Sequence, residues 1–163
     1  RVDMRGGIRA EEEPRIARDG GLAQRLAVVL ALGDRQAIIM RTNAANEDVV
    51  AVADLAIELG LAGVIATNTT ISREGLVADS QKVAEIGAGG LSGAPLKQRA
   101  IEVLEILAKR LAGNVAIISV GGIETPQEAQ ERLDNGATLV QGYTGFIYEG
   151  PLWARRINRE LTR

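Results

Sequence analysis

Short apolar runs alternate along this sequence with longer segments in which apolar residues recur every three or four positions, and this alternation restricts the possible folds more than any other feature. The apolar runs cover residues 37–40 (AIIM), 63–66 (GVIA), 115–120 (VAIISV) and 137–141 (ATLVQ). None of these runs alternates cleanly with polar residues, so each is expected to be a strand that is covered on both faces. Strands of that kind are typical of parallel sheets.

The longer segments have the periodicity of helices. We expect helices over residues 22–32, 48–59, 97–111 and 152–161. A shorter helix is expected to begin at Pro126, because proline suits the first helical turn and Thr125 can cap the N-terminus. That helix is expected to end by Asn135 and Gly136, since glycine is common just past a helix C-terminus.

This order of elements predicts successive right-handed βαβ units, which build either an open doubly wound sheet or a (β/α)8 barrel. A complete barrel takes about 250 residues, whereas this chain has 163. Because the chain has room for about four or five units, we expect one α/β domain over residues 1–163 that forms about half of a barrel. Residues 37–163 hold the strand–helix units, and residues 1–36 form an N-terminal segment and helix.

The composition argues against several classes of function. Lysine and arginine number 19 against 21 acidic residues, so the net charge of -2 offers no positively charged surface for nucleic acid or an anionic membrane. The chain has no cysteine and no histidine, which removes disulfides, a cysteine nucleophile and the usual zinc ligands. No apolar run approaches the roughly 20 residues of a membrane-spanning helix, and the N-terminus is too charged for a signal peptide. We therefore expect a cytoplasmic protein without a metal site.

Polar residues or glycines follow each predicted strand, at the end of the sheet where α/β folds place their binding sites. These residues are 41–43 (RTN), 67–70 (TNTT), 121–122 (GG) and 142–145 (GYTG). The glycine pair and the Tyr-Thr-Gly turn lie where barrels bind a phosphate through backbone N–H groups. Glycine lets the backbone approach an anion because it has no Cβ atom. An ordinary turn is the alternative for a pair of glycines.

Residues 67–70 place four side-chain hydrogen-bonding groups directly after a buried strand. Such a set can bind a planar ligand rich in heteroatoms, with Asn68 supplying both a donor and an acceptor. A helix N-cap is the alternative, but no helical pattern follows at once. Arg41 ends another strand and either holds an anion on a cofactor or remains solvated. Residues 71–93 form one long irregular stretch, and loops of this length tend to be functional.

Four motifs carry a resemblance to a known family. The stretches IATNTTISREGL, GGLSGAPL, SVGGI and GATLVQGYTGFIYEGP occur in this order, close to the spacing found in the quinone-linked, membrane-associated dihydroorotate dehydrogenases. The similarity runs from about Asp54 to the end and implies the C-terminal half of an FMN-dependent (β/α)8 barrel, with residues 37–163 as its last four strand–helix units. It also implies oxidation of dihydroorotate to orotate in pyrimidine biosynthesis, with a quinone as electron acceptor and a peripheral location on the inner membrane.

The resemblance implies roles for the residues that follow the second predicted strand. Thr67 is expected to contact the flavin, while Asn68 and Thr69 bind the carboxylate or the ring amides of the pyrimidine substrate. Arg41 stands where the family has a lysine close to the flavin, which keeps the charge and changes the shape. Residues 71–88 correspond to a family loop that flanks the active site.

The resemblance also implies a phosphate site. Gly93 and Gly122 are expected to meet the FMN phosphate through their N–H groups, and Tyr143 and Thr144 to complete this site. Gly142 stands where a larger apolar residue is common in the family, so we expect a looser strand end there.

The first residues depart from the family. The motif SSPNTPGLR, which carries the serine base and two substrate asparagines, would align with residues 1–9 (RVDMRGGIR), where the final Gly-Ile-Arg is similar. No catalytic residue can therefore be assigned, and the first half of the barrel is expected to lie outside this chain. The alternative is a non-catalytic half-barrel that binds FMN or a phosphate, with open sheet edges that pair two copies into a homodimer. A different flavin barrel with the same phosphate site is a third possibility.

Overall fold

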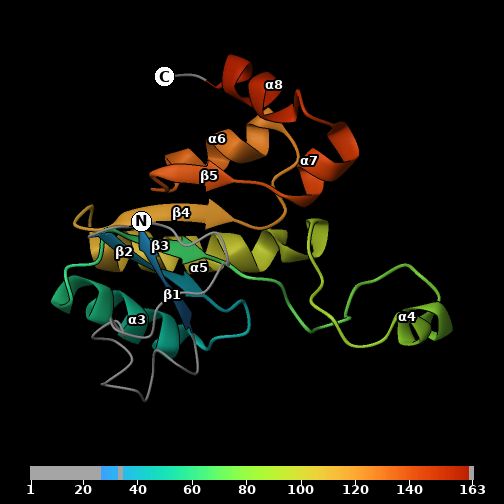
Figure 1. The fold of residues 1–163 in the computed structure, drawn as a ribbon, viewed down its shortest axis with the longest axis horizontal. Helices are drawn as coiled ribbons and strands as arrows, with labels where there is room; N and C mark the ends of the chain where they lie inside the picture. Colours follow the sequence, from blue (N-terminus) through green and yellow to red (C-terminus); the bar gives the residue numbers. More distant parts are fainter. Residues whose placement is uncertain (1–26, 33–34, 162–163) are drawn as a thin grey trace, which may run out of the picture.

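A computed structural model describes residues 27–32 and 35–161 of the chain. Figure 1 shows the elements in sequence order along the chain. They are β1 (Ala27–Leu32), β2 (Arg35–Met40), α3 (Asn46–Glu58), β3 (Gly63–Ala66), α4 (Ser80–Ile86), the 3-10 turn η1 (Ala94–Leu96), α5 (Lys97–Leu111), β4 (Ala116–Val120), α6 (Pro126–Asp134), β5 (Leu139–Gln141), α7 (Thr144–Glu149) and α8 (Trp153–Glu160).

The strands form one sheet in the order β1-β2-β3-β4-β5. Strands β2 to β5 pair in parallel, with Met40 beside Ala66 and Ala66 beside Ser119. This confirms the predicted parallel sheet and its four strands. Each pair of neighbouring parallel strands is connected through a helix, α3 between β2 and β3, α5 between β3 and β4, and α6 between β4 and β5. The helical segments of the prediction match α3, α5, α6 and α8 to within two residues at each end.

The predicted helix over residues 22–32 is wrong in the part that the structure describes. Ala27–Leu32 forms β1, which pairs antiparallel with β2, while residues 22–26 lie outside the described residues. Two residues of sequence separate β1 from β2, and so short a connection permits an antiparallel pair and no parallel one. Because β1 covers one edge of the parallel strands, the free edges of the described sheet are β1 and β5.

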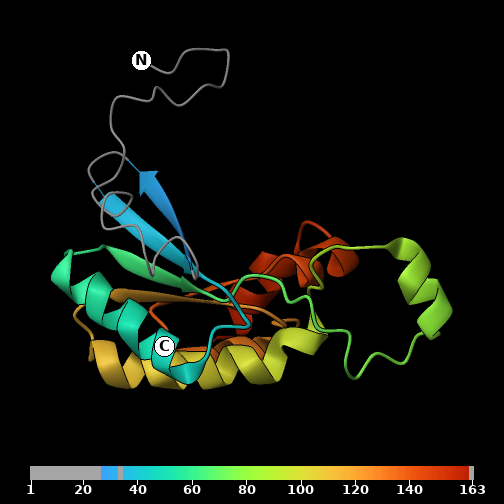
Figure 2. The same cartoon turned by 90° about the horizontal axis from the view of Figure 1, so that it is seen from below.

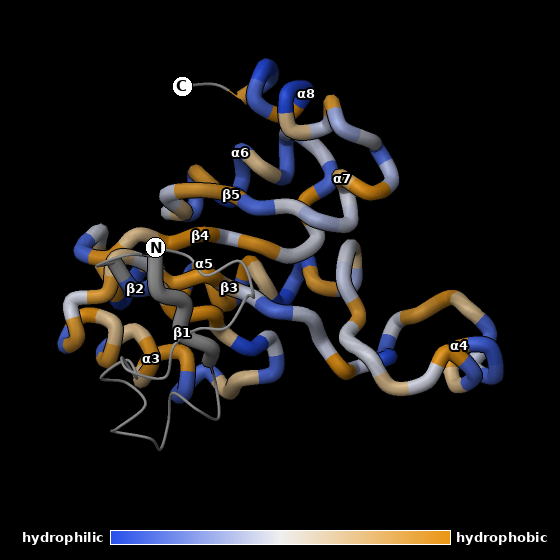
Figure 3. Tube along the Cα trace, viewed as in Figure 1, coloured by the Kyte–Doolittle hydropathy of each residue, from blue (hydrophilic) through white to orange (hydrophobic). Residues whose placement is uncertain are grey.

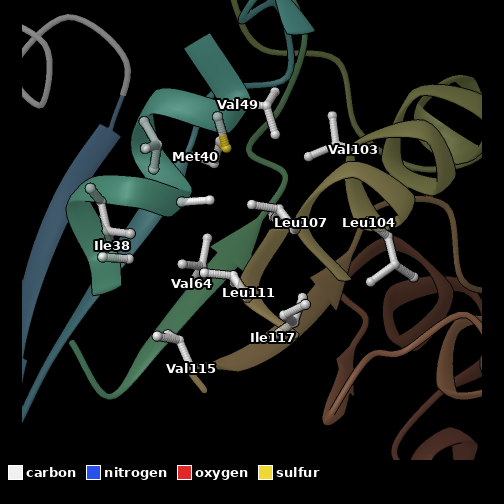
Figure 4. Close-up of a cluster of buried hydrophobic side chains, with 14 of the residues drawn as sticks. Ile38, Met40, Val49, Val64, Val103, Leu104, Leu107, Leu111, Val115 and Ile117 are labelled. Atoms are coloured by element: carbon white, nitrogen blue, oxygen red, sulfur yellow. The ribbon is translucent and has the colours of Figure 1, made fainter. Parts of the chain in front are cut away.

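The main core lies between the sheet and the helices α3 and α5, which share one face of it (Figures 2 and 4). Ile38, Val64 and Ile117 contribute to this core from three neighbouring strands and are at most 3% exposed. Leu107 and Leu111 of α5 pack against them and are fully buried. Each buried aliphatic side chain of this size stabilises the fold by roughly 1.5–3 kcal/mol, so this layer fixes the positions of the strand ends.

The opposite face of the sheet is covered less completely. Ile39, Ile65, Ile118 and Val120 alternate with the core residues along their strands, and each is only partly buried. The prediction that the strands are covered on both faces therefore holds for one face among the described residues. Apolar side chains on the second face are what the interior of a barrel requires.

A long arm projects from the body between β3 and α5, as both views show (Figures 1 and 2). A single antiparallel bridge between Thr70 and Leu91 closes its base. The predicted irregular stretch contains one helix, α4, whose N-cap Asp79 accepts hydrogen bonds from two backbone N–H groups. Apolar stretches along the arm (Figure 3) include Val77 and Ile86, which are fully or largely exposed. No helix of residues 27–32 and 35–161 is long and apolar enough to cross a bilayer.

Candidate binding site at the strand ends

A cavity of about 220 Å³ lies at the carboxyl ends of the parallel strands. Every site residue predicted from the sequence lines it, apart from Arg41: they are Thr67, Asn68, Thr69, Gly93, Gly122, Tyr143 and Thr144. Ile39, Ile65 and Val120, from the second face of the sheet, supply apolar surface to the same cavity. The structure thus brings together the segments after β3, β4 and β5 and the loop before α5.

The backbone after β3 is fixed by its neighbours. The N–H of Thr67 donates to the carbonyl of Val120 at 2.8 Å, and the N–H of Asn68 donates to that of Met40 at 2.8 Å. The hydroxyl of Thr42 donates to the carbonyl of Asn68. These bonds continue the sheet past the end of β3 and hold both residues at the cavity. The alternative interpretation, a helix N-cap, is not observed, because the next helix begins at Ser80.

The side chains of this segment offer hydrogen bonds to a ligand. The hydroxyl of Thr67 is buried and has no partner among the described residues, and a buried polar group in that state costs roughly 1–3 kcal/mol. Asn68 Oδ1 accepts from the N–H of Thr69 at 2.7 Å, which leaves the donors of its amide nitrogen without a partner in the described part of the chain. Thr67 and Asn68 both line the cavity.

The glycine pair after β4 is required by the fold itself. Gly121 and Gly122 have φ values of 119° and 72°, in a region that favours glycine. A Cβ atom at Gly122 would lie 2.4 Å from Cγ and 3.0 Å from the backbone nitrogen of Lys97. Glycine is therefore required at this position by the start of α5, and the approach of its backbone to an anion stays a prediction.

The peptide between these glycines has a defined orientation. The guanidinium of Arg132 donates to the carbonyl of Gly121 at 3.1 Å and to the carbonyl of Lys97 at 3.1 Å. The C=O and N–H of a trans peptide point in opposite directions, so the N–H of Gly122 points away from Arg132. Gly122 lines the cavity, and its N–H has no backbone hydrogen-bond partner among the described residues.

Arg132 itself was not predicted. It is 1% exposed and lies on the buried side of α6 with Ala129. Burial lowers its pKa, and the negative charges of Glu131 and Glu128 oppose that effect. The spacing of three residues from Ala129 puts it on the apolar stripe of the helix, and a charged residue in that stripe is the signal that identifies it.

Two further loops close the side of the cavity. The hydroxyl of Thr144 donates to the hydroxyl of Ser92 at 2.9 Å. A Cβ atom at Gly93 would lie 2.9 Å from Cγ2 of Thr144, so the loop before α5 and the start of α7 touch. Tyr143 is 69% exposed at the rim.

Arg41 is exposed and is not one of the cavity residues. Its loop is tied to α5 instead, because Arg99 donates to the carbonyl of Ala44 at 2.7 Å and to that of Thr42 at 3.3 Å. The structure therefore does not bring Arg41 to the cavity, and its role in flavin binding stays a prediction.

Hydrogen bonds and ion pairs of charged side chains fix the start of α6. Glu128 accepts from the N–H groups of Glu124 and Thr125 at 2.8 and 3.0 Å, which confirms Thr125 as the N-cap. Lys97 Nζ lies 2.6 Å from Glu128 and 3.0 Å from Glu124. Burial alone raises the pKa of Glu128, but these hydrogen bonds outweigh it and the pKa is lowered. The hydrogen bond with Glu128 is the main cause that raises the pKa of Lys97.

Gly142 is packed more tightly than the sequence suggested. A Cβ atom there would lie 2.2 Å from Cη2 of Trp153. The indole ring therefore occupies the space of a side chain at this strand end, and its Nε1 donates to the carbonyl of Glu124 at 2.9 Å. The expectation of a looser strand end is wrong, because α8 supplies the missing volume.

Comparison with known proteins gives one consistent family. A family model described as dihydroorotate dehydrogenase matches residues 13–163. A "Dihydroorotate dehydrogenase (quinone)" of Thermobifida fusca (strain YX) is 64% identical over 115 residues, which cover 71% of this chain and 30% of that protein. One from Kocuria rhizophila is 50% identical over 161 residues, which cover 96% of this chain and 44% of that protein.

Solved structures agree with this result. DHODH from Eimeria tenella, crystallised in complex with ferulenol, superposes with a TM-score of 0.68 at 42% identity, over 75% of this chain and 32% of the other. Its ligand-free form gives a TM-score of 0.68 at 41% identity, with 75% and 33% covered. The chain spans less than half the length of these relatives. Its parallel β/α units form part of a barrel.

Proposed function

This chain belongs to the dihydroorotate dehydrogenase family, and from that premise we propose that it is the C-terminal half of the barrel of a quinone-linked enzyme that oxidises dihydroorotate to orotate in pyrimidine biosynthesis. The observation that carries the proposal is the cavity at the strand ends, lined by residues from the family motifs TNTT, GGLSG, SVGG and GYTG. Quinone is the proposed electron acceptor, and a peripheral membrane location follows from that partner.

The residues of the cavity fit the phosphate end of FMN. The N–H of Gly122 and the loops of Gly93 and Thr144 surround a pocket of about 220 Å³, which is smaller than the roughly 300–1,000 Å³ of complete ligand sites. Backbone N–H groups next to glycines are suited to an anion. The cavity therefore matches a part of a nucleotide, and FMN remains our proposal for the group.

The residues after β3 fit the reacting end. When bound, FMN supplies the acceptor for a hydride from C6 of dihydroorotate. The buried hydroxyl of Thr67 has a donor and an acceptor to offer a flavin edge. The amide of Asn68 and the hydroxyl of Thr69 are placed to orient a carboxylate or a ring amide of the substrate. The proton from the substrate needs a general base, and none of the described cavity residues is assigned that role.

The experiment is an anaerobic addition of dihydroorotate to the chain reconstituted with FMN. The proposed activity predicts that the visible flavin absorbance is lost and that addition of a quinone restores it. A removed general base typically lowers a rate by about 10² to 10⁴, so slow bleaching over hours still supports it. Complete absence of bleaching by a chain that binds FMN supports the second candidate, a non-catalytic FMN- or phosphate-binding half-barrel. The observation that favours this candidate is the small volume of the cavity, together with the lack of an assigned base among its described residues.

A further inference from the structure

Arg132 is a buried cation directly behind the glycine turn. Its side chain comes from α6, and it donates to the carbonyls of Gly121 and Lys97 at 3.1 Å and to the hydroxyl of Ser119 at 3.3 Å. Its Nε has no hydrogen-bond partner among the described residues. All three acceptors are neutral, and Glu131 and Glu128 act on the guanidinium only through their electrostatic field.

The nearby carboxylates do not neutralise this charge by contact. In the described part of the chain, no carboxylate lies within ion-pair distance of Arg132, while Glu124 and Glu128 both pair with Lys97. Charges this deeply buried are normally paired or bound to a ligand. Burial lowers the pKa of Arg132, as expected for a cation in a poorly solvated position. A buried charge that no carboxylate contacts, close to a ligand cavity, favours the binding of an anion in that cavity.

The hydrogen bond to Gly121 has a second consequence. It holds the carbonyl toward α6 and so directs the N–H of Gly122 away from α6, at a residue that lines the cavity. A donor that is already aligned before binding costs no reorganisation when an anion arrives. The guanidinium also polarises this peptide, since its positive charge draws electron density toward the carbonyl.

We propose that Arg132 is a positioning residue for the phosphate of the cofactor. It acts through the Gly121–Gly122 peptide, which it orients, and through its buried positive charge, which favours an anion in the cavity. The inference rests on the proposed function, because it takes the phosphate of FMN to be the anion. It also predicts that a substitution of Arg132 weakens binding of the phosphate group and leaves binding of the flavin ring unchanged.

The test compares two ligands that differ by the phosphate. FMN and riboflavin are titrated into the 163-residue chain, and flavin fluorescence gives each dissociation constant. We expect Arg132→Met to weaken FMN about tenfold or more, as the loss of a charge-assisted interaction does, and to leave riboflavin within about twofold. The matched control is Arg110→Met, which should change neither constant. Arg110 lies in the last turn of α5 and pairs with Asp54 of α3.

Arg132→Lys separates charge from geometry and covers the case in which Arg132→Met does not fold. Lysine keeps the charge but lacks the planar fork that spans two carbonyls, so we expect a loss of FMN affinity of about threefold, with riboflavin unchanged. Equal losses for both ligands, or no loss for FMN in either variant, overturn the inference while the proposed function stands. Failure of the unaltered chain to prefer FMN over riboflavin overturns the phosphate site itself and the inference with it.

Discussion

At the scale of single residues, Gly122 decides whether the cavity can form. Its φ of 72° and its contact with the start of α5 both exclude a side chain. Lys97 cannot move aside freely, because it is held by ion pairs with Glu124 and Glu128. The contact between Gly122 and Lys97 and the ion pairs of Lys97 with Glu124 and Glu128 therefore restrain one another beside the cavity.

We expect Gly122→Ala to lower the free energy of unfolding by about 2–4 kcal/mol, the sum of backbone strain and overpacking. The matched control is Gly60→Ala, which has a similar φ of 61° and no heavy atom within 4 Å of the added Cβ. It should cost about 1 kcal/mol, from strain alone. Urea unfolding followed by the fluorescence of the single tryptophan measures both. Equal costs for the two variants would show that Lys97 does not restrict the turn.

Glu128 gives the chain a pH-dependent contribution to stability. Its pKa is lowered from 4.5 in the folded state, so its contribution is present above pH 4.5 and is lost as the pH falls through the lowered value. We expect Glu128→Gln to cost about 1 kcal/mol at pH 7, a value that allows for partial exposure. The difference from the unaltered chain should shrink toward zero as the pH falls below the lowered pKa of Glu128. Glu105→Gln, an exposed site on α5, serves as the control, and a cost of Glu128→Gln that does not change with pH would contradict the assignment.

At the scale of elements, the packing of β5 against α8 depends on one glycine. The indole of Trp153 fills the position that a side chain at Gly142 would take. We expect Gly142→Val to cost about 1–3 kcal/mol by overpacking. Trp153→Leu in the same chain should recover part of this cost, with a coupling energy of about 1 kcal/mol in the double-mutant cycle. Strictly additive effects in thermal unfolding would mean that the two positions do not compete for space.

The elements differ in how far the sequence determines them. β3 and α5 have the predicted bounds, because a short apolar run and a long helical period each point to one structure. The segment AVVLAL of β1 is a short apolar run, and such a run is compatible with a strand and with a helix. Its pairing with β2 makes it a strand. α7 was not predicted, since its six residues TGFIYE have no clear helical period.

The residues of the site also differ in how far the sequence determines them. Seven residues of the cavity could be predicted because they belong to continuous motifs, whereas Ile39, Ile65 and Val120 were not predicted to line it. Arg132 could not be assigned in the same way, because its partners Ser119, Gly121 and Lys97 come from other parts of the chain. Gly142 was misjudged for a similar reason, since the ring that fills its space comes from α8. Contacts between distant segments are what the sequence leaves open.

At the scale of the whole molecule, the exposed edge strand β5 favours association. Leu139 on this edge is 60% exposed, and unpaired edges invite pairing with another strand. We expect the chain to form a homodimer at micromolar concentration, with about twice the 17.3 kDa of one copy. Light scattering coupled to gel filtration measures this mass.

Leu139→Lys tests where the two copies meet. A charge on the edge should shift the mass toward one copy. Ile57→Lys alters an exposed apolar residue on α3, away from the edge, and should leave the dimer intact. A single-copy mass for the unaltered chain at every concentration would contradict the pairing of edges.

The central claim is that the cavity at the strand ends binds the phosphate end of FMN, and amide NMR tests it most directly. In a titration of the isotopically labelled chain with FMN, we predict the largest shift changes at the N–H groups of Gly93, Gly122 and Thr144, which line the cavity. Gly60 and Gly113 lie outside it and should not shift. Changes confined to other parts of the chain, or no changes at saturating FMN, would contradict the claim.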